Sequence, residues 1–327
     1  MKYFNEPCLY KINGSSIVEL SKNIGLFDYC VNEVSNFLFQ DSLASNNIYN
    51  ELEIFSYRYR LMATAGTLNL GRIKKLFPFN SFYELNKSEF LALYKANRRK
   101  KSKSHPFQQI IINCKENYNR YCYYCGVDHF ENIDHFLPKG DLNSDFQLFF
   151  PQLSVMSYNL IPSCGTCNRT KSSHIGNYIT ETLIHPYFSK FLNDPFIYCN
   201  AHFNNGVVSF SYSYYFPDKW LNQNKIRAKN QINKFDLLNR YSVASSSEFK
   251  KHLIKYKRTL DKSGSDTLID LIIDEYLSVQ TALGVNHWET LMYLSLARNF
   301  SNFVDYLNTI STPQSTKYIN PADISRI

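Results

Sequence analysis

Residues 122–125 read CYYC, residues 133–139 read IDHFLPK, residues 158–160 read YNL, and residues 164–171 read CGTCNRTK. Four of the chain's eight cysteines fall in this stretch, as two pairs with two residues between their members. This spacing lets one turn of backbone offer two thiolates to a metal ion, and a second pair completes a tetrahedral set. The stretch therefore predicts one zinc ion bound by Cys122, Cys125, Cys164 and Cys167. Because four thiolates leave no open position for a substrate, this zinc is expected to be structural.

The two cysteine pairs are separated by 38 residues, whereas a plain zinc ribbon has about 15–20. A sizeable segment is therefore expected to lie between them. A redox-active pair and simple burial are the rival interpretations of these cysteines. Two pairs, in a chain whose N-terminus has no apolar signal core, favour zinc over both.

The segment between the pairs contains an acid next to an imidazole, Asp134 and His135. Ile133 precedes them and Pro138 follows, which is typical of a short strand that ends in a bend. Neighbouring strand residues point to opposite faces, so the two side chains can share a target only at such a bend. A second apolar run stops at Pro162, and a helix is expected to begin at the second cysteine pair. The expected order is strand, loop, strand, helix.

These residues resemble the HNH (ββα-metal) endonucleases, in the subgroup whose zinc-binding pairs bracket the motif. The matching pattern is C-x-x-C, then D-H-x-x-P, then N-L, then C-x-x-C-N-x-x-K. The resemblance implies that His135 is the general base that deprotonates the attacking water. It also implies that Asp134 and Asn168 bind one catalytic divalent cation, and that the Asn159 amide pins the loop between the strands and so orients His135. Asn168 stands at the position of the final histidine, an H-N-N variant whose oxygen donors favour Mg²⁺ or Mn²⁺ over zinc.

The chemistry of phosphodiester hydrolysis agrees with these roles. Histidine can form a nucleophile from water at neutral pH, and a metal ion can stabilise charge on the leaving oxygen. Arg169 and Lys171 follow Asn168 on the expected helix and could contact flanking phosphates, although ordinary surface charge explains them about as well. The alternative for His135 is a hydrogen-bonded structural histidine. Its position next to Asp134 and between two cysteine pairs favours the catalytic role.

The composition indicates a folded protein. At 327 residues the chain suggests about two domains, and its hydrophobic content of 44% and aromatic content of 16% exclude a disordered chain. No uncharged apolar run approaches the roughly 20 residues of a membrane span. A cytoplasmic protein without membrane contact is expected. The remaining cysteines are expected to be reduced thiols, and they are Cys8, Cys30, Cys114 and Cys199.

The positive charge lies on both sides of the predicted HNH stretch. Residues 84–125 contain nine basic and three acidic residues, and residues 219–262 contain twelve and three. From residue 264 to the end the balance is reversed, with three basic and seven acidic residues. Such a distribution suits a phosphate-binding protein, although solvated helices are often rich in lysine.

The sequence outside the HNH stretch predicts helices. A helical region with a basic end is expected over residues 1–105, including helices at Ile17–Phe39, Ser56–Phe77 and Ser88–Arg98. Residues 106–215 are expected to form the ββα-metal module and a β-hairpin that packs against it, with strands at 196–203 and 207–214. Residues 216–327 are expected to be helical, with helices at 224–238, 247–260, 267–283 and 288–307 and a loose end from Thr312. The predicted fold class is α+β, mostly helical.

These observations favour a metal-dependent HNH endonuclease that cuts DNA. By resemblance, such proteins are often restriction or anti-phage effectors, sometimes working with a separate ATPase. An RNase with the same base and metal is an alternative, for instance one that cleaves tRNA, because tyrosine-rich flanks suit stacking on unpaired bases. A catalytically inactive, zinc-stabilised nucleic-acid-binding or adaptor protein is a third possibility. Such a protein has no need for a base beside a metal ligand.

Overall fold

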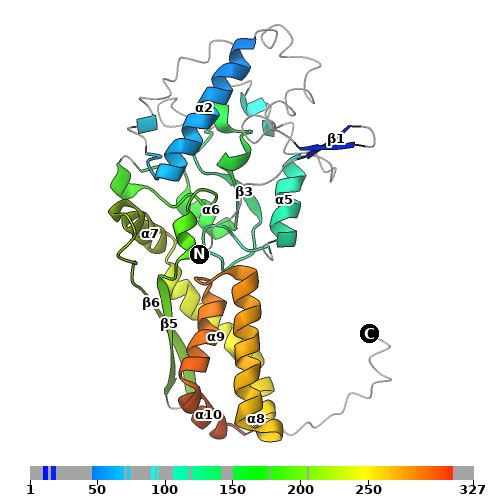
Figure 1. Cartoon of the computed structure of the whole chain (residues 1–327), viewed down its shortest axis with the longest axis vertical. Helices are drawn as coiled ribbons and strands as arrows, with labels where there is room; N and C mark the ends of the chain where they lie inside the picture. Colours follow the sequence, from blue (N-terminus) through cyan, green and yellow to red (C-terminus); the bar gives the residue numbers. More distant parts are fainter. Residues whose placement is uncertain are drawn as a thin grey trace.

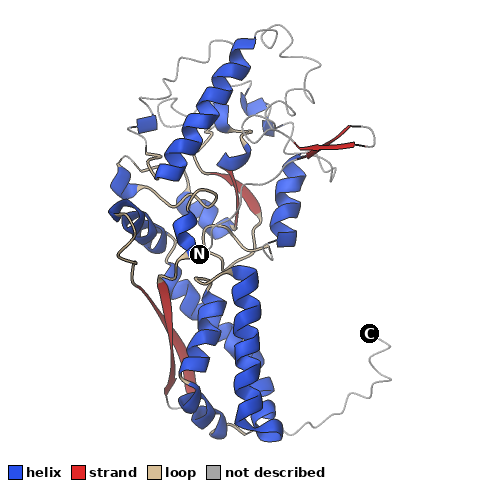
Figure 2. Ribbon diagram, in the orientation of Figure 1, coloured by secondary structure: helices blue, strands red, loops and turns tan. Residues whose placement is uncertain are grey.

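The structure is a computed structural model, and it describes residues 10–13, 16–19, 46–69, 72–73, 90–92, 94–95, 106–117, 120–140, 150–176, 178–204 and 206–311. These residues form an α+β protein in which helices predominate (Figure 2). The strands described occur as three separate antiparallel pairs. The predicted fold class is therefore confirmed.

The described residues of the N-terminal part include a short strand pair and two longer helices. β1 (Tyr10–Asn13) pairs with β2 (Ser16–Glu19), and the helices are α2 (Asn46–Ala65) and α5 (Pro106–Asn117). The prediction of a helix over Ile17–Phe39 is wrong at its start, because β2 occupies that sequence. The adjacent β-branched residues Ile17 and Val18 favour a strand there. The rest of that predicted helix lies outside the described residues.

The middle of the molecule contains the strand–strand–helix unit that the sequence predicts. β3 (Asn132–His135) pairs antiparallel with β4 (Leu160–Ser163), and α6 (Gly165–Lys171) follows. Two single-turn helices precede β4, η1 (Pro151–Leu153) and η2 (Ser157–Asn159). In Figure 1 this unit lies between α2 above and the long C-terminal helices below.

The β-hairpin after the unit has the predicted strands but a different packing partner. Its strands are β5 (Ile197–Asn204) and β6 (Val207–Tyr214), preceded by η3 (Ile179–Glu181) and η4 (Lys190–Asn193). The Tyr212 hydroxyl donates to the Trp288 carbonyl at 2.7 Å, and the Phe210 ring meets the Phe249 ring at 5.7 Å. The hairpin therefore lies along the C-terminal helices (Figure 1). The expectation that it packs against the zinc-binding module is wrong.

The C-terminal part consists of α7 (Asn222–Lys234), α8 (Leu237–Leu283), α9 (Trp288–Arg298) and α10 (Phe300–Asn308). α8 is two helices that meet at Gly264, where φ is 81°. A salt bridge of 2.9 Å between Lys255 and Glu275, on opposite sides of Gly264, shows that the chain turns back there. The predicted helix over 288–307 is likewise divided at Asn299.

One hydrophobic core connects these parts. It includes Tyr59 of α2, Tyr158 of the ββα unit, Phe196 next to β5 and Tyr241 of α8, all of them fully buried. Two sequence-based predictions lie outside the described residues. They are the basic end of the N-terminal helical region, at residues 98–103, and the loose end from Thr312.

Candidate metal centre and candidate active site

The four predicted zinc ligands come together in one buried cluster. The sulfur atoms of Cys122, Cys125, Cys164 and Cys167 all lie within 4.8 Å of one another. In each pair a backbone N–H group donates a hydrogen bond to a cysteine sulfur. The Val127 N–H donates to the Cys125 sulfur at 3.4 Å, and the Cys167 N–H donates to the Cys164 sulfur at 3.3 Å. Cys164 is also the N-cap of α6. The sequence prediction that these cysteines can bind one metal ion such as zinc is confirmed.

The protonation of these cysteines fits a cation at their centre. Hydrogen bonding to Cys122 lowers the pKa of the Cys164 thiol to about 6, whereas burial raises the pKa of Cys122 well above its usual value. Four thiolates this close cannot all be ionised without a positive charge between them. Zn²⁺ supplies that charge and prefers such a tetrahedral sulfur set.

His135 is the last residue of β3, and its ring is oriented by the loop between the two strands. Its Nε2 lies 2.9 Å from the Ser154 carbonyl oxygen. A neutral imidazole in this contact carries its proton on Nε2 and its lone pair on Nδ1. The ring of Tyr94 meets the His135 ring edge-on at 4.7 Å, and only 7% of His135 is exposed.

Asn159 ties the same loop to the end of β3. Its amide nitrogen donates to the Leu137 and Leu153 carbonyls at 3.0 and 3.2 Å, and its amide oxygen accepts from the Leu137 N–H at 2.8 Å. The Tyr59 hydroxyl also donates to that oxygen, at 3.0 Å. Because Leu153 directly precedes Ser154, the amide helps to hold the carbonyl that contacts His135.

Asp134 lies inside the unit, between α6 and the first cysteine pair. Its Oδ2 accepts from the Tyr124 hydroxyl at 2.7 Å and forms an ion pair of 2.9 Å with Lys171. Burial raises the pKa of Tyr124 well above its usual value, and the Asp134 charge raises it further. Tyr124 therefore acts as a donor here. Among the described residues, Asp134 Oδ1 makes no hydrogen bond, so this oxygen could bind a cation.

The structure corrects the prediction for Lys171. Only 1% of this residue is exposed, and its ammonium group also donates to the His135 carbonyl at 2.8 Å. Burial lowers the pKa of Lys171, and the Asp134 carboxylate opposes that effect. In this position Lys171 connects α6 to β3 and cannot reach a phosphate on the surface. Arg169, by contrast, is exposed as predicted.

Asn168 is half-buried and lies one helical turn before Lys171. Residues three apart share a face of a helix, so Asn168 lies on the side of α6 that faces β3. Its side chain makes no hydrogen bond with any residue that the structure describes. α6 therefore packs against β3.

Sequence reasoning missed several residues that support this site. Tyr124, Ser154 and Tyr94 contact Asp134 or His135. Tyr124 lies between the cysteines of the first pair, where the motif leaves the residue type open, and the contacts of Ser154 and Tyr94 depend on packing between segments distant in sequence. His185 is another buried histidine, bonded to Tyr59 and held neutral because burial lowers its pKa well below the usual value. It lies in a turn, as its position before Pro186 predicts.

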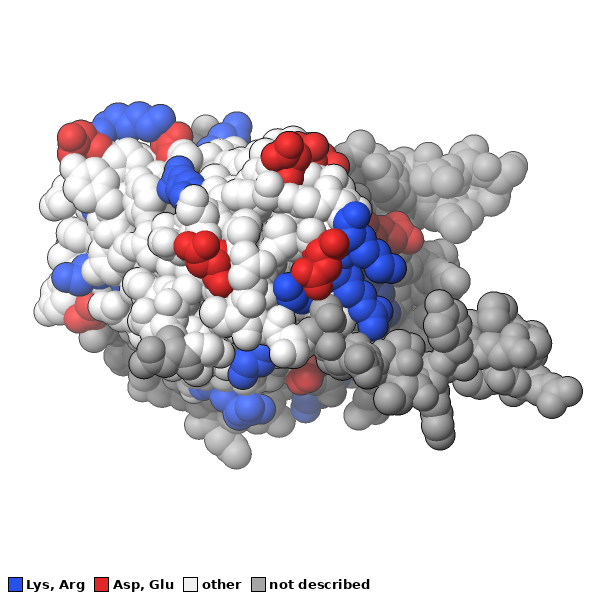
Figure 3. All heavy atoms as spheres, turned by 90° about the horizontal axis from the view of Figure 1, so that it is seen from below, with Lys and Arg blue, Asp and Glu red and all other residues white. Residues whose placement is uncertain are grey.

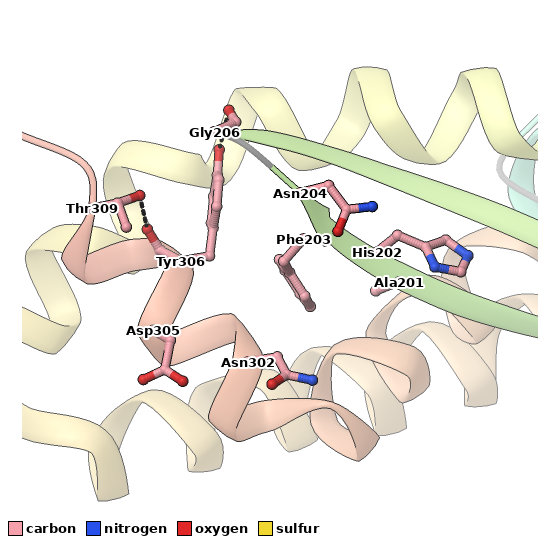
Figure 4. A pocket seen from close by; sticks show the side chains of 9 residues that line it. All are labelled: Ala201, His202, Phe203, Asn204, Gly206, Asn302, Asp305, Tyr306 and Thr309. Atoms are coloured by element: carbon pink, nitrogen blue, oxygen red, sulfur yellow. Dashed lines mark hydrogen bonds between the residues drawn. The ribbon is translucent and has the colours of Figure 1, made fainter.

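One cavity lined by described residues lies away from this site. Its volume is about 720 Å³ and it lies at the tip of the hairpin beside α10, where Figure 4 shows Phe203 and Tyr306 on its walls. None of the predicted site residues lines it.

The face of the molecule seen from below carries both basic and acidic side chains, so no field of one sign covers that face (Figure 3).

Comparison with known proteins identifies one distant relative. The chain is 25% identical over 262 residues to "Protein ea31" of Escherichia phage lambda. The aligned region covers 74% of this chain and 83% of that protein. No family profile matches the sequence, and no solved structure matches it. The HNH resemblance therefore rests on the sequence motif. Within the described part of the chain, no helix is both long and apolar enough to cross a membrane.

Proposed function

We propose that the protein is a metal-dependent HNH endonuclease that hydrolyses phosphodiester bonds in DNA. The observation that carries this proposal is the position of His135. Its ring lies at the end of β3, oriented by a carbonyl from a loop that Asn159 holds, in a strand–strand–helix unit bracketed by the cysteine cluster. An adaptor protein would not require this arrangement.

The residues divide the chemistry between them. His135, with its lone pair on Nδ1, takes the proton from the attacking water. Asp134 Oδ1 and the Asn168 amide oxygen would hold Mg²⁺ or Mn²⁺, both of which prefer oxygen ligands. The bound cation would polarise the phosphate and stabilise charge on the leaving oxygen. Lys171 and Tyr124 fix the Asp134 carboxylate through its other oxygen.

Substrate access is part of the same proposal. The Tyr94 ring packs edge-on against His135, which is only 7% exposed. Side chains around His135, Tyr94 among them, would therefore move aside when a phosphate binds. Arg169, exposed on α6, would contact a flanking phosphate. The resemblance adds a cytoplasmic defence role and a separate ATPase partner to the proposal. RNA is the alternative substrate of the same site.

The test compares purified wild type with His135→Ala and with His202→Ala. His202 is an exposed histidine of β5 and serves as the control. Supercoiled plasmid and total tRNA are offered with Mg²⁺ or Mn²⁺ and again with EDTA. We expect wild type and His202→Ala to cut the plasmid only with metal. We expect His135→Ala to lose cleavage while keeping its zinc content and its fold.

Each outcome of this assay decides between the alternatives. Cleavage of tRNA and not of plasmid would replace DNA with RNA as the substrate. Cleavage by His135→Ala at the wild-type rate would exclude His135 as the base. If folded, zinc-loaded wild type cuts neither substrate, also after addition of candidate partner proteins, the adaptor interpretation replaces the nuclease.

A further inference from the structure

Arg240, on the first turns of α8, donates hydrogen bonds to one cysteine of each pair. Its Nη1 lies 3.3 Å from the Cys167 sulfur, and its Nη2 lies 3.2 Å from the Cys125 sulfur. Nη2 also forms a 2.8 Å ion pair with Asp128, in the turn after the first cysteine pair. One guanidinium group, with a side chain only 17% exposed, therefore bridges the two halves of the cysteine cluster.

Other contacts hold the C-terminal helices against the first cysteine pair. The Tyr241 hydroxyl donates to the Cys125 carbonyl at 3.0 Å. The Gly126 carbonyl lies 2.8 Å from His287 Nε2 and accepts from Trp288 Nε1 at 2.9 Å. These residues come from α8 and from the start of α9. The turn at Cys125 and Gly126 is therefore hydrogen-bonded to residues more than 100 positions later in the sequence.

The charge of the cluster explains why a cation lies there. Zn²⁺ with four thiolates has a net charge of about −2, and this charge is costly to bury. Hydrogen bonds from a charged donor stabilise thiolates and make them weaker competitors for protons. Arginine suits the position because its planar fork can contact two sulfurs and a carboxylate together, whereas lysine is a point charge.

We propose that Arg240 is a positioning residue of the zinc centre, and that its hydrogen bonds couple zinc retention to docking of the C-terminal helices. Groups that hydrogen-bond to metal ligands commonly alter metal affinity by about 10–100-fold. The proposal rests on zinc at the four cysteines and not on nuclease activity. A result that contradicts the proposed function would therefore leave this proposal unchanged, and the reverse also holds.

The first experiment measures zinc release to an excess of a chromogenic chelator. Arg240→Met is compared with wild type and with Arg258→Met, an exposed arginine of the same helix that makes no bond with the described residues. We expect Arg240→Met to release zinc about ten-fold faster or more. Arg258→Met should match wild type. Arg240→Lys should fall between them, and it keeps the test decisive if Arg240→Met does not fold.

The second experiment measures amide hydrogen exchange in wild type before and after removal of zinc by a chelator. The proposal predicts faster exchange at residues 237–245 and 287–292, the segments that contain Arg240, Tyr241, His287 and Trp288. Equal zinc release by the Arg240 and Arg258 variants would overturn the role of Arg240. Unchanged exchange in these two segments after zinc removal would overturn the coupling, and wild type purified without zinc would overturn both.

Discussion

Lys171 and Asp134 form an ion pair inside the ββα unit, where the effect of a charge on stability depends on its partner. The carboxylate accepts from Tyr124 as well, and the ammonium group donates to the His135 carbonyl. Each charge has lost most of its water, so removing either one leaves the other buried and poorly compensated.

We predict that Lys171→Met lowers the free energy of unfolding by about 3–5 kcal/mol, the usual cost of breaking a buried pair. Urea denaturation followed by circular dichroism measures this change. Arg169→Met, an exposed neighbour on the same helix, should stay within about 0.5 kcal/mol of wild type. If Lys171→Met kept full stability and lost only affinity for nucleic acid, the original phosphate-binding interpretation would be restored.

The sequence was sufficient to predict the four cysteines of the metal site, but not the residues that support Asp134 and His135. The C-x-x-C spacing identifies the cysteine cluster because that spacing itself determines the geometry of the turn. Burial of Lys171 is different, since a lysine beside a surface arginine has the same local sequence whether α6 turns it inward or outward. Ser154 and Tyr94 are more difficult still, because their contacts with His135 join segments 19 and 41 residues away in sequence.

At the scale of elements, Gly264 divides α8 into a helical hairpin. Its φ of 81° and ψ of 179° lie in a region that side chains strongly disfavour. A Cβ atom at this position would meet nothing within 4 Å, so a substitution strains the backbone without a clash. The salt bridge between Lys255 and Glu275 connects the two arms.

Gly264→Ala should therefore lower the free energy of unfolding by about 2 kcal/mol, through backbone strain alone. Thermal and urea denaturation both measure it. The neighbouring Ser263→Ala substitution is the control and should change stability by less than about 0.5 kcal/mol. Equal stabilities for the two variants would show that the chain adopts another turn at this point.

The elements themselves were largely predictable, and their packing was not. Alternation over 197–204 and 207–214, with a turn signal between them, predicts the hairpin because the pattern and the turn are local. The same pattern does not determine which element packs against the buried face of the hairpin. Tyr212 and Phe210 could bury against any apolar surface, and in the structure they meet α8 and α9.

At the scale of the whole molecule, the packing of α8 against α9 places three acids near one another. Burial, followed by repulsion from Glu248 and Glu275, raises the pKa of Glu289 to about 7, and Lys251 opposes this shift. A glutamate with a raised pKa in the folded state stabilises the fold below its unfolded value of 4.5. That contribution is lost as the pH rises through about 7.

Glu289→Gln should therefore gain stability relative to wild type as the pH rises from 5 to 8. The shift corresponds to about 3 kcal/mol, and because Glu289 is partly exposed we expect about half of it. Urea denaturation at several pH values measures the difference, and comparing two proteins cancels the titration of the cysteines. Asp266→Asn, an exposed acid of α8, is the control and should show no such trend. A difference that stays constant between pH 5 and 8 would show that Glu289 ionises freely.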